Sequence, residues 1–249
     1  MKKKVFILLL ASTITALSTF TVNATTESQT TTDSSSESST ISFRCIPWWT
    51  SKSEVEKTLV SDGAEIQQAA FEDHILRMSG IDFSNTTSGN DRVDGGGIVG
   101  RYSGIGVAGY TPTDTQACYI YTLNEDGSIN KDKDSAQFYF GWYTFDSNDY
   151  VDGESVYNDL SQKLTSLYGT GESNDESDYF TTITWHDANS NQIRLLLGGK
   201  NKDYKYVTLG YMAADADSRL NEMQAALDAE AIANEAAERE SNKDNLSGL

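Results

Sequence analysis

The sequence predicts an α+β fold built from two repeats, each a helix followed by antiparallel strands. The repeats are expected to form one curved sheet with the helices on one face, and a further helix follows at the C-terminus. Three observations lead to this prediction. Residues 136–145 have the pattern of one long aromatic strand, residues 152–169 carry apolar side chains at helical spacing, and three short alternating strands follow up to Met212. A shorter helix after Trp48 begins the same order once before.

Residues 1–24 have the pattern of a secretory signal peptide. Three lysines precede an apolar run that begins at Val5, and Val22-Asn23-Ala24 places small residues at a cleavage point. Serines and threonines interrupt the apolar run, so a retained membrane anchor is the less favoured alternative. We therefore predict a secreted, extracellular protein with no membrane span after removal of the signal.

Residues 25–40 are almost entirely Ser, Thr, Glu, Gln and Asp. Such a segment buries too little apolar area to offset the entropy lost on ordering, so it predicts a disordered Ser/Thr-rich linker. The remaining chain is long enough for one larger domain or for two small repeats.

The chain is strongly acidic, with a net charge of −18. Residues 1–24 hold three lysines and no acid, so their removal leaves 16 basic and 37 acidic side chains and a net charge of −21. Repulsion from phosphate argues against nucleic acid and against a bare anionic membrane as partners. The acidity is explained by solubility outside the cell, although a basic protein partner is compatible with it.

The first repeat is predicted at residues 41–146. Ser51 and Glu54 have the spacing of a capping box, and an apolar pair four residues apart predicts a short helix that ends before Gly63. Residues 85–104 are rich in Gly, Ser, Asn and Asp and predict a mobile loop. Strands are expected at 75–81, 105–110, 116–123 and 136–145, with a turn at 124–127. The last of these strands is aromatic on both faces, so we expect it in the middle of the sheet.

The second repeat is predicted at residues 147–214. Its helix begins at Asp152, carries the stripe Val156, Leu160, Leu164 and Leu167, and ends at Gly169. Three alternating strands follow, and the first two are joined by the turn at 187–191. Residues 215–249 are rich in Ala and Glu and predict a C-terminal helix that docks by its first turns and frays beyond them. Glu230 and Asn234 occupy positions where a coiled coil needs apolar residues.

The two cysteines, Cys45 and Cys118, predict a disulfide if the chain is oxidised outside the cell, with two separate buried thiols as the alternative. Two cysteines and two histidines without zinc-ligand spacing make a structural metal site improbable. The run Gly104-Ile-Gly-Val-Ala-Gly109 matches a dinucleotide-binding pattern, but Pro112 would break the helix that such a site needs. We expect no metal and no cofactor.

The order of elements resembles the tandem helix-and-sheet repeats of β-lactamase-inhibitory-protein-like domains and the related SmpA/OmlA (BamE-like) module. The resemblance covers roughly residues 41–212. The residues that carry it are Pro47-Trp48-Trp49-Thr50-Ser51, Val55 and Leu59 in the first repeat, and Tyr157, Leu160, Leu164 and Tyr168-Gly169-Thr170-Gly171 in the second. Gly171 stands where these families usually have proline, and the Gly-rich insert is a further departure.

The resemblance implies a non-catalytic surface on the concave sheet face that binds an extracellular protein. Candidate ligand-binding residues on that face are Tyr119, Tyr121, Tyr139 and Tyr143. For each of the four, taken singly, packing in the core is the favoured alternative. No nucleophile motif accompanies either histidine, and no carboxylate pair can be singled out, so we predict that the chain is not an enzyme.

Two other functions remain open. Thirteen tyrosines and four tryptophans could stack on sugars, which would make the chain a secreted carbohydrate-binding module for a polysaccharide. Alternatively, it is a structural or spacer domain of a surface complex that uses the C-terminal helix. A sugar platform needs several coplanar exposed aromatic rings, so the exposure of the tyrosines separates the alternatives.

Overall fold

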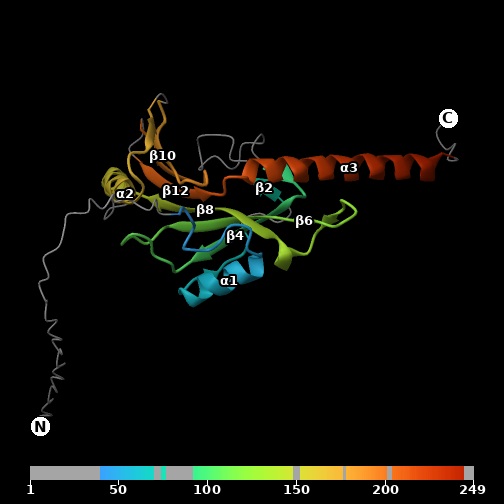
Figure 1. The fold of residues 1–249 in the computed structure, drawn as a ribbon, viewed down its shortest axis with the longest axis horizontal. Helices are drawn as coiled ribbons and strands as arrows, with labels where there is room; N and C mark the ends of the chain where they lie inside the picture. The colour runs from blue at the N-terminus through green and yellow to red at the C-terminus, as the bar shows by residue number, and fades with distance from the viewer. Residues whose placement is uncertain are drawn as a thin grey trace, which may run out of the picture. The chain divides into compact units, whose positions relative to one another are not determined.

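The computed structural model describes residues 40–69, 74–76, 92–147, 152–175, 178–200 and 204–243, with 74–76 and 92–94 described by their backbone alone. The predicted signal peptide and all of the predicted linker except Thr40 lie outside the described residues. The described part has three α-helices and is α+β, as predicted (Figure 1). The helices are α1 (Lys52–Ser61), α2 (Gly153–Tyr168) and α3 (Ala216–Asn242).

One antiparallel sheet has eight strands in the order β1-β4-β5-β8-β12-β11-β10-β9. Its strands are β1 (Glu65–Ile66), β4 (Gly97–Ser103), β5 (Asp114–Ile120), β8 (Gln137–Asp146), β9 (Glu172–Asn174), β10 (Phe180–His186), β11 (Gln192–Gly198) and β12 (Tyr206–Met212). Two small two-stranded sheets pair β2 (His74–Leu76) with β3 (Arg92–Asp94) and β6 (Thr122–Leu123) with β7 (Ile129–Asn130). A short 3₁₀ helix, η1 (Lys133–Ser135), precedes β8.

The order of strands along the chain is mirrored about the middle of the main sheet. In the first half, α1 is followed by β1, β4, β5 and β8, which are neighbours in that order. In the second half, α2 is followed by β9, β10, β11 and β12, which are also neighbours in chain order. The last strands of the two halves, β8 and β12, pair antiparallel in the centre.

The aromatic strand β8 lies between β5 and β12, which confirms the predicted central position. Phe138 and Phe140 are fully buried, and Trp142 is nearly so. A central strand buried on both faces can carry large apolar side chains at every position. The double aromatic pattern of this strand therefore reflects coverage of both faces.

Helices α1 and α2 contact the same face of the main sheet. Tyr102, Tyr143 and Ile183 share that face, because a series of directly opposed residues links them across the strands. The Tyr102 hydroxyl donates to Glu56 of α1 at 3.3 Å. Gly171, which follows α2, packs closely against Ile183. Helix α3 lies on the other side of the sheet from α1 (Figure 1).

The segment before α1 inserts an aromatic side chain into the core. The Phe43 ring stacks on Tyr143 with centroids 5.0 Å apart and contacts Phe138 at 5.6 Å. Gly141 leaves room for this ring, because a Cβ atom there would come within 2.8 Å of it. The glycine in the middle of β8 is therefore needed for close packing.

The two predicted helices form with different caps. Helix α1 buries Val55 and Leu59, but the side chain of Ser51 accepts no capping hydrogen bond, and its hydroxyl donates to Glu54 instead. The predicted capping box is thus wrong in its detail. Helix α2 begins after Asp152, close to the predicted start, and the Asp152 carboxylate caps it by accepting from two backbone N–H groups. Leu167, the last member of the predicted apolar stripe of α2, is exposed.

Part of the predicted loop at 85–104 is a strand of the main sheet. Residues 97–103 form β4, whose first four residues are buried. A Cβ atom at Gly100 of β4 would collide with the Tyr102 side chain, so a glycine is needed there for close packing. The strand expected at 105–110 is instead a tight turn. Val107 and Tyr110 exchange backbone hydrogen bonds across it, and Ala108 has a φ of 53°.

Candidate functional site

The four tyrosines predicted to bind a ligand lie inside the protein. Tyr119 and Tyr139 are fully buried, Tyr143 is 1% exposed and Tyr121 is 2% exposed. They cannot form an exposed binding face, because the elements packed on both sides of the sheet cover them. This corrects the assignment of these residues to a concave aromatic surface.

Two of these tyrosines have defined roles in the core. The hydroxyl groups of Tyr119 and Tyr102 share a hydrogen bond of 2.7 Å, which satisfies buried polar atoms. Tyr143 packs beneath Phe43. Burial raises the pKa of Tyr143 to about 12 and raises the pKa of Tyr119 well above its ordinary value, so both phenols stay protonated at neutral pH.

The predicted disulfide between Cys45 and Cys118 is wrong, since both thiols are free. Cys45 is exposed in a two-residue turn, in which Arg44 and Cys45 both have positive φ and Ile46 N–H donates to the carbonyl of Phe43. Cys118 is buried in β5. Its neighbour Tyr119 points to the α1 face, so the Cys118 side chain points to the opposite face, and the sheet separates the two sulfur atoms.

This arrangement predicts unequal reactivity of the two thiols. We expect a maleimide to label Cys45 rapidly in the folded protein and Cys118 only after unfolding. Burial also raises the pKa of the Cys118 thiol, which lowers the fraction present as thiolate. Mass spectrometry of the labelled protein should show one adduct under native conditions and two in denaturant. Cys45→Ser should remove the native adduct, and a Cys45→Ser protein that still labels quickly would contradict the expectation.

The first turn of α3 is held to the segment before α1 by a polar clamp. The guanidinium of Arg219 lies 3.8 Å from the centre of the Trp49 ring and forms an ion pair of 3.1 Å with Asp215. The Trp49 indole donates to the same carboxylate at 3.0 Å. Arg219 also donates to the amide oxygen of Gln137, at the start of β8, at 3.1 Å. This clamp fixes where α3 begins.

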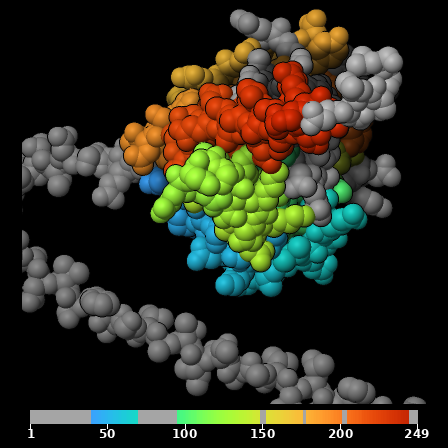
Figure 2. Space-filling view, turned by 90° about the vertical axis from the view of Figure 1, so that its right-hand side faces the viewer, coloured from blue at the N-terminus to red at the C-terminus, as the bar shows by residue number. Residues whose placement is uncertain are grey.

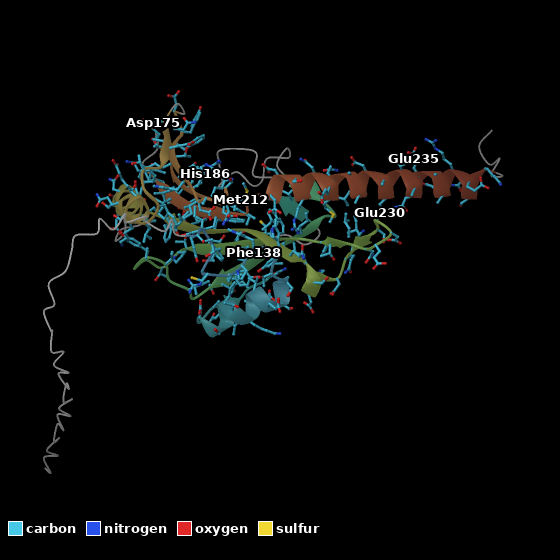
Figure 3. The ribbon with its side chains drawn as sticks, in the orientation of Figure 1. Phe138, Asp175, His186, Met212, Glu230 and Glu235 are labelled. Carbon is cyan, nitrogen blue, oxygen red and sulfur yellow. The ribbon has the colours of Figure 1, made fainter. Side chains whose placement is uncertain are left out.

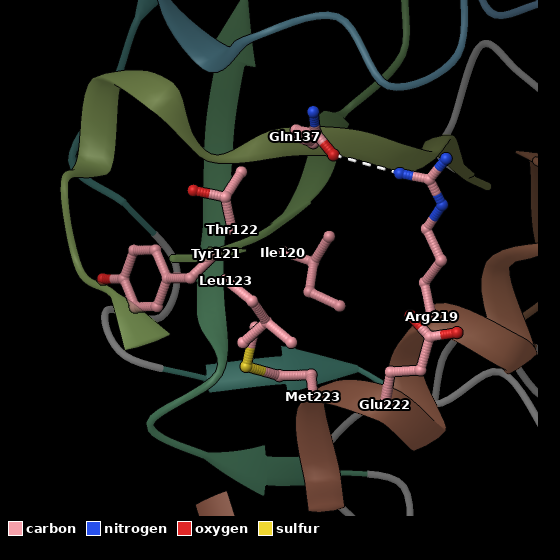
Figure 4. A pocket seen from close by; sticks show the side chains of 8 residues that line it. All are labelled: Ile120, Tyr121, Thr122, Leu123, Gln137, Arg219, Glu222 and Met223. Carbon is pink, nitrogen blue, oxygen red and sulfur yellow. Dashed lines mark hydrogen bonds between the residues drawn. The ribbon is translucent and has the colours of Figure 1, made fainter. Parts of the chain in front are cut away.

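A groove of about 300 Å³ lies beside this clamp, between α3 and the ends of β5, β6 and β8. Figure 4 shows its side chains, with Arg219 bonded to Gln137 at one side. The lining residues are Ile120, Tyr121, Thr122, Leu123, Gln137, Arg219, Glu222 and Met223. Ile120 and Met223 are buried, whereas Leu123 is 41% exposed. The groove therefore has an apolar floor that is partly accessible.

Beyond the groove, α3 leaves the sheet. Its buried residues are confined to the first turns, namely Ala216, Leu220 and Met223. Lys131 pairs with Glu230 at 3.2 Å, and in Figure 2 the red helix lies against the yellow-green segment that contains β6 and β7. The helix is buried only in its first turns, as predicted, but the predicted fraying beyond them is wrong, because the helix continues to Asn242. Every residue from 228 to 243 is exposed. Figure 3 labels Glu230 and Glu235 on this part of α3.

A second cavity, of about 290 Å³, lies at the junction of β1 and β4 and is lined mainly by polar side chains. Two of its lining residues, Arg101 of β4 and Asp114 of β5, form an ion pair of 2.7 Å. His186, the histidine at the end of β10, is exposed. In the part of the chain that the structure describes, no three metal-ligating side chains form a cluster. Within the same part, no helix has the length and apolar character needed to span a membrane.

No signal in the sequence points to the groove, since its parts come from distant segments. Trp49 and Asp215 are 166 residues apart along the chain. Comparisons with protein-family models, curated proteins and solved structures give no match to this chain.

Proposed function

We propose that this chain is an exported, non-catalytic binding protein that holds an extracellular protein partner by the groove and the exposed part of α3. The observation that carries the proposal is the exposure of α3 from Asp228 onward, including Ile232, which is 68% exposed. Helices in proteins gain most of their stability from packing an apolar face. A long helix exposed all round either bridges to another body or is sustained by i,i+4 side-chain pairs such as Glu235 with Arg239, and we propose the first role for α3.

The mirrored order of strands supports a second part of the proposal. We infer that residues 41–146 and 147–214 are two structural repeats that meet at β8 and β12, since each half runs from a helix into four neighbouring strands. A shared central pair of long strands makes a rigid platform. Such a platform suits the presentation of a groove and a helix to a partner, as in the helix-and-sheet binding modules that the sequence resembles.

The four buried tyrosines cannot stack on a sugar, so a carbohydrate-binding function would need other, exposed aromatic rings. Tyr179 is 70% exposed and Tyr204 is 48% exposed. Both lie at one end of the β10-β11-β12 meander, where the N–H of Lys200 donates to the carbonyl of Tyr179 at 3.1 Å. Exposed tyrosine rings at one end of a sheet offer apolar faces on which a sugar could stack. This surface is separate from the groove in sequence and in strand position, so the two functions are separable by mutation.

The test compares three full-length proteins: the unmodified chain, Ile232→Glu and Tyr179→Ser. Each is immobilised and exposed to extracellular proteins from the producing cells and to a polysaccharide array. We expect saturable binding of a protein that Ile232→Glu weakens by about tenfold or more, because one lost apolar anchor costs about 1–3 kcal/mol. Tyr179→Ser serves as the control and should leave that binding unchanged. Saturable binding to glycans alone, lost in Tyr179→Ser, would contradict the proposal and favour the carbohydrate alternative.

A further inference from the structure

The floor of the groove is suited to one apolar side chain of a partner. Ile120 and Met223 close it from below, and Leu123 is left 41% exposed on β6. A volume of about 300 Å³ is enough for one large side chain and not for a whole helix. Insertion of an apolar anchor would remove the exposed part of Leu123 from water, which is the usual source of affinity at the centre of an interface.

The free charge at the mouth of the groove is negative. Arg219 is already neutralised, because it pairs with Asp215 at 3.1 Å and stacks on Trp49. Glu222 stands one turn further along α3 and has neither an ion pair nor a hydrogen bond within the described ranges. A charged group that enters the groove therefore meets an unneutralised carboxylate.

The same sign continues along the exposed part of α3. Between residues 228 and 243 the acidic side chains are Asp228, Glu230, Glu235, Glu238 and Glu240, and the basic ones are Arg239 and Lys243. Glu230 pairs with Lys131, Glu235 with Arg239 and Glu240 with Lys243, so Asp228 and Glu238 are the acids of this stretch that no ion pair neutralises within the described residues. Glu230 and Glu235 are marked in Figure 3 on the part of the helix that has left the sheet. A second copy of this chain would bring like charges together, and with a net charge of −18 per chain that contact is repelled.

We infer that the groove and the adjoining exposed part of α3, which carries a net negative charge, bind a basic segment of the partner protein, which inserts one apolar side chain over Leu123. The inference rests on the proposed function and specifies the chemistry of its partner. Glu222 is the residue that receives a Lys or Arg flanking the anchor. The exposed acids further along α3 attract the segment over a longer range and are screened by salt.

The probe is a fluorescent helical peptide of Lys and Ala with one central Leu, titrated against the full chain at low salt and followed by anisotropy. Two companion peptides replace the Leu with Ser or all Lys with Glu. We expect saturable binding of the Lys peptide with Leu and at least about tenfold weaker binding of both companions, equivalent to about 1.4 kcal/mol. Leu123→Ser and Glu222→Lys should each weaken the first peptide by a similar factor.

The matched control is Glu172→Lys, on the edge strand β9 at the far side of the sheet, which changes the net charge as much as Glu222→Lys does. It should leave peptide binding unchanged. Equal weakening by Glu222→Lys and Glu172→Lys would overturn the inference, because net charge alone would then explain binding. Equal affinity for the Leu and Ser peptides would show that no apolar side chain is inserted over Leu123. If Ile232→Glu abolishes capture of a protein partner and no basic peptide binds, the proposed function stands and the basic segment is wrong. Binding to glycans alone would instead contradict the proposed function.

Discussion

Asp187→Ala is expected to lower the free energy of unfolding by about 3 kcal/mol, because it removes a buried carboxylate that joins the segment at Ile41 to the turn at 187–191. The carboxylate accepts from the backbone N–H of Ile41 at 2.8 Å and from those of Asn189 and Asn191 at 2.9 Å. The side-chain amide of Asn191 donates to it at 3.0 Å. Loss of these bonds leaves buried donors without an acceptor and releases the segment that carries Phe43. Urea unfolding should show a lower midpoint with an unchanged slope.

The contribution of Asp187 should also depend on pH. Burial alone would raise the pKa of its carboxyl group, but the hydrogen bonds from Asn191, Ile41 and Asn189 outweigh burial and hold the pKa below its ordinary value. A lowered folded-state pKa stabilises the fold fully above the unfolded-state pKa of about 3.9, and this stabilisation is lost as the pH falls through the folded-state pKa. The difference in unfolding free energy between the unmodified chain and Asp187→Asn should therefore shrink below about pH 4.

Glu172→Ala is the control for Asp187→Ala, since it also removes one negative charge but from an exposed strand. It should change stability by less than about 0.5 kcal/mol. A difference between the unmodified chain and Asp187→Asn that stays constant from neutral to acid pH would show that the hydrogen bonds to the charged form do not carry the effect.

The elements that the sequence predicts well are those whose pattern is local. Val156, Leu160 and Leu164 repeat at helical spacing and are all buried on α2, and Asp152 caps the helix as its position suggests. The strands β10, β11 and β12 alternate clearly and form the predicted meander. In each case a few neighbouring residues contain the whole signal, so tertiary contacts were not needed to find the element.

The elements that the sequence misplaces are those in which glycine has a packing role. Gly97 and Gly100 make residues 97–103 look like a loop, yet Gly100 is in a strand because the Tyr102 ring occupies the space of a side chain. Between 105 and 110 the apolar residues suggest a strand, but positive φ at Ala108 and Gly109 turns the chain back on itself. Composition alone does not distinguish a glycine that allows a turn from one that admits a ring.

The candidate site could not be predicted from the sequence for a different reason. Alternation along β8 shows that both faces are aromatic, but it does not show which segments cover them, and the answer here is that both are covered. The groove depends on Trp49, Gln137 and Arg219, which meet only after the sheet and α3 have formed. The strong acidity of the chain, by contrast, is visible in the sequence. The structure is needed to see that acidic side chains of α3 lie beside the groove and on the exposed part of the helix.

Trp185→Ala is expected to lower the free energy of unfolding by about 4 kcal/mol, the larger of the two effects, because it leaves a cavity beneath the end of α2. Trp185 is 2% exposed on β10, and its indole N–H donates to the carbonyl of Gly169 at 3.0 Å. Gly171 passes directly over the ring, since a Cβ atom at that position would approach the indole to 2.7 Å. The ring therefore fixes the end of α2 on the sheet by packing and by one hydrogen bond.

Two further variants separate these contributions when all are compared by urea unfolding. Trp185→Phe keeps most of the apolar contact but leaves the carbonyl of Gly169 without its donor, so it should cost about 1–2 kcal/mol. Leu167→Ala truncates an apolar side chain of α2 that is 60% exposed, and it should cost less than about 0.5 kcal/mol. The loss in free energy of unfolding should therefore be largest for Trp185→Ala, smaller for Trp185→Phe and smallest for Leu167→Ala. This order follows from burial and hydrogen bonding alone. If Trp185→Ala were no more harmful than Leu167→Ala, α2 would not be anchored to the sheet through this ring, and the rigid platform proposed for partner binding would lose its main support on that side.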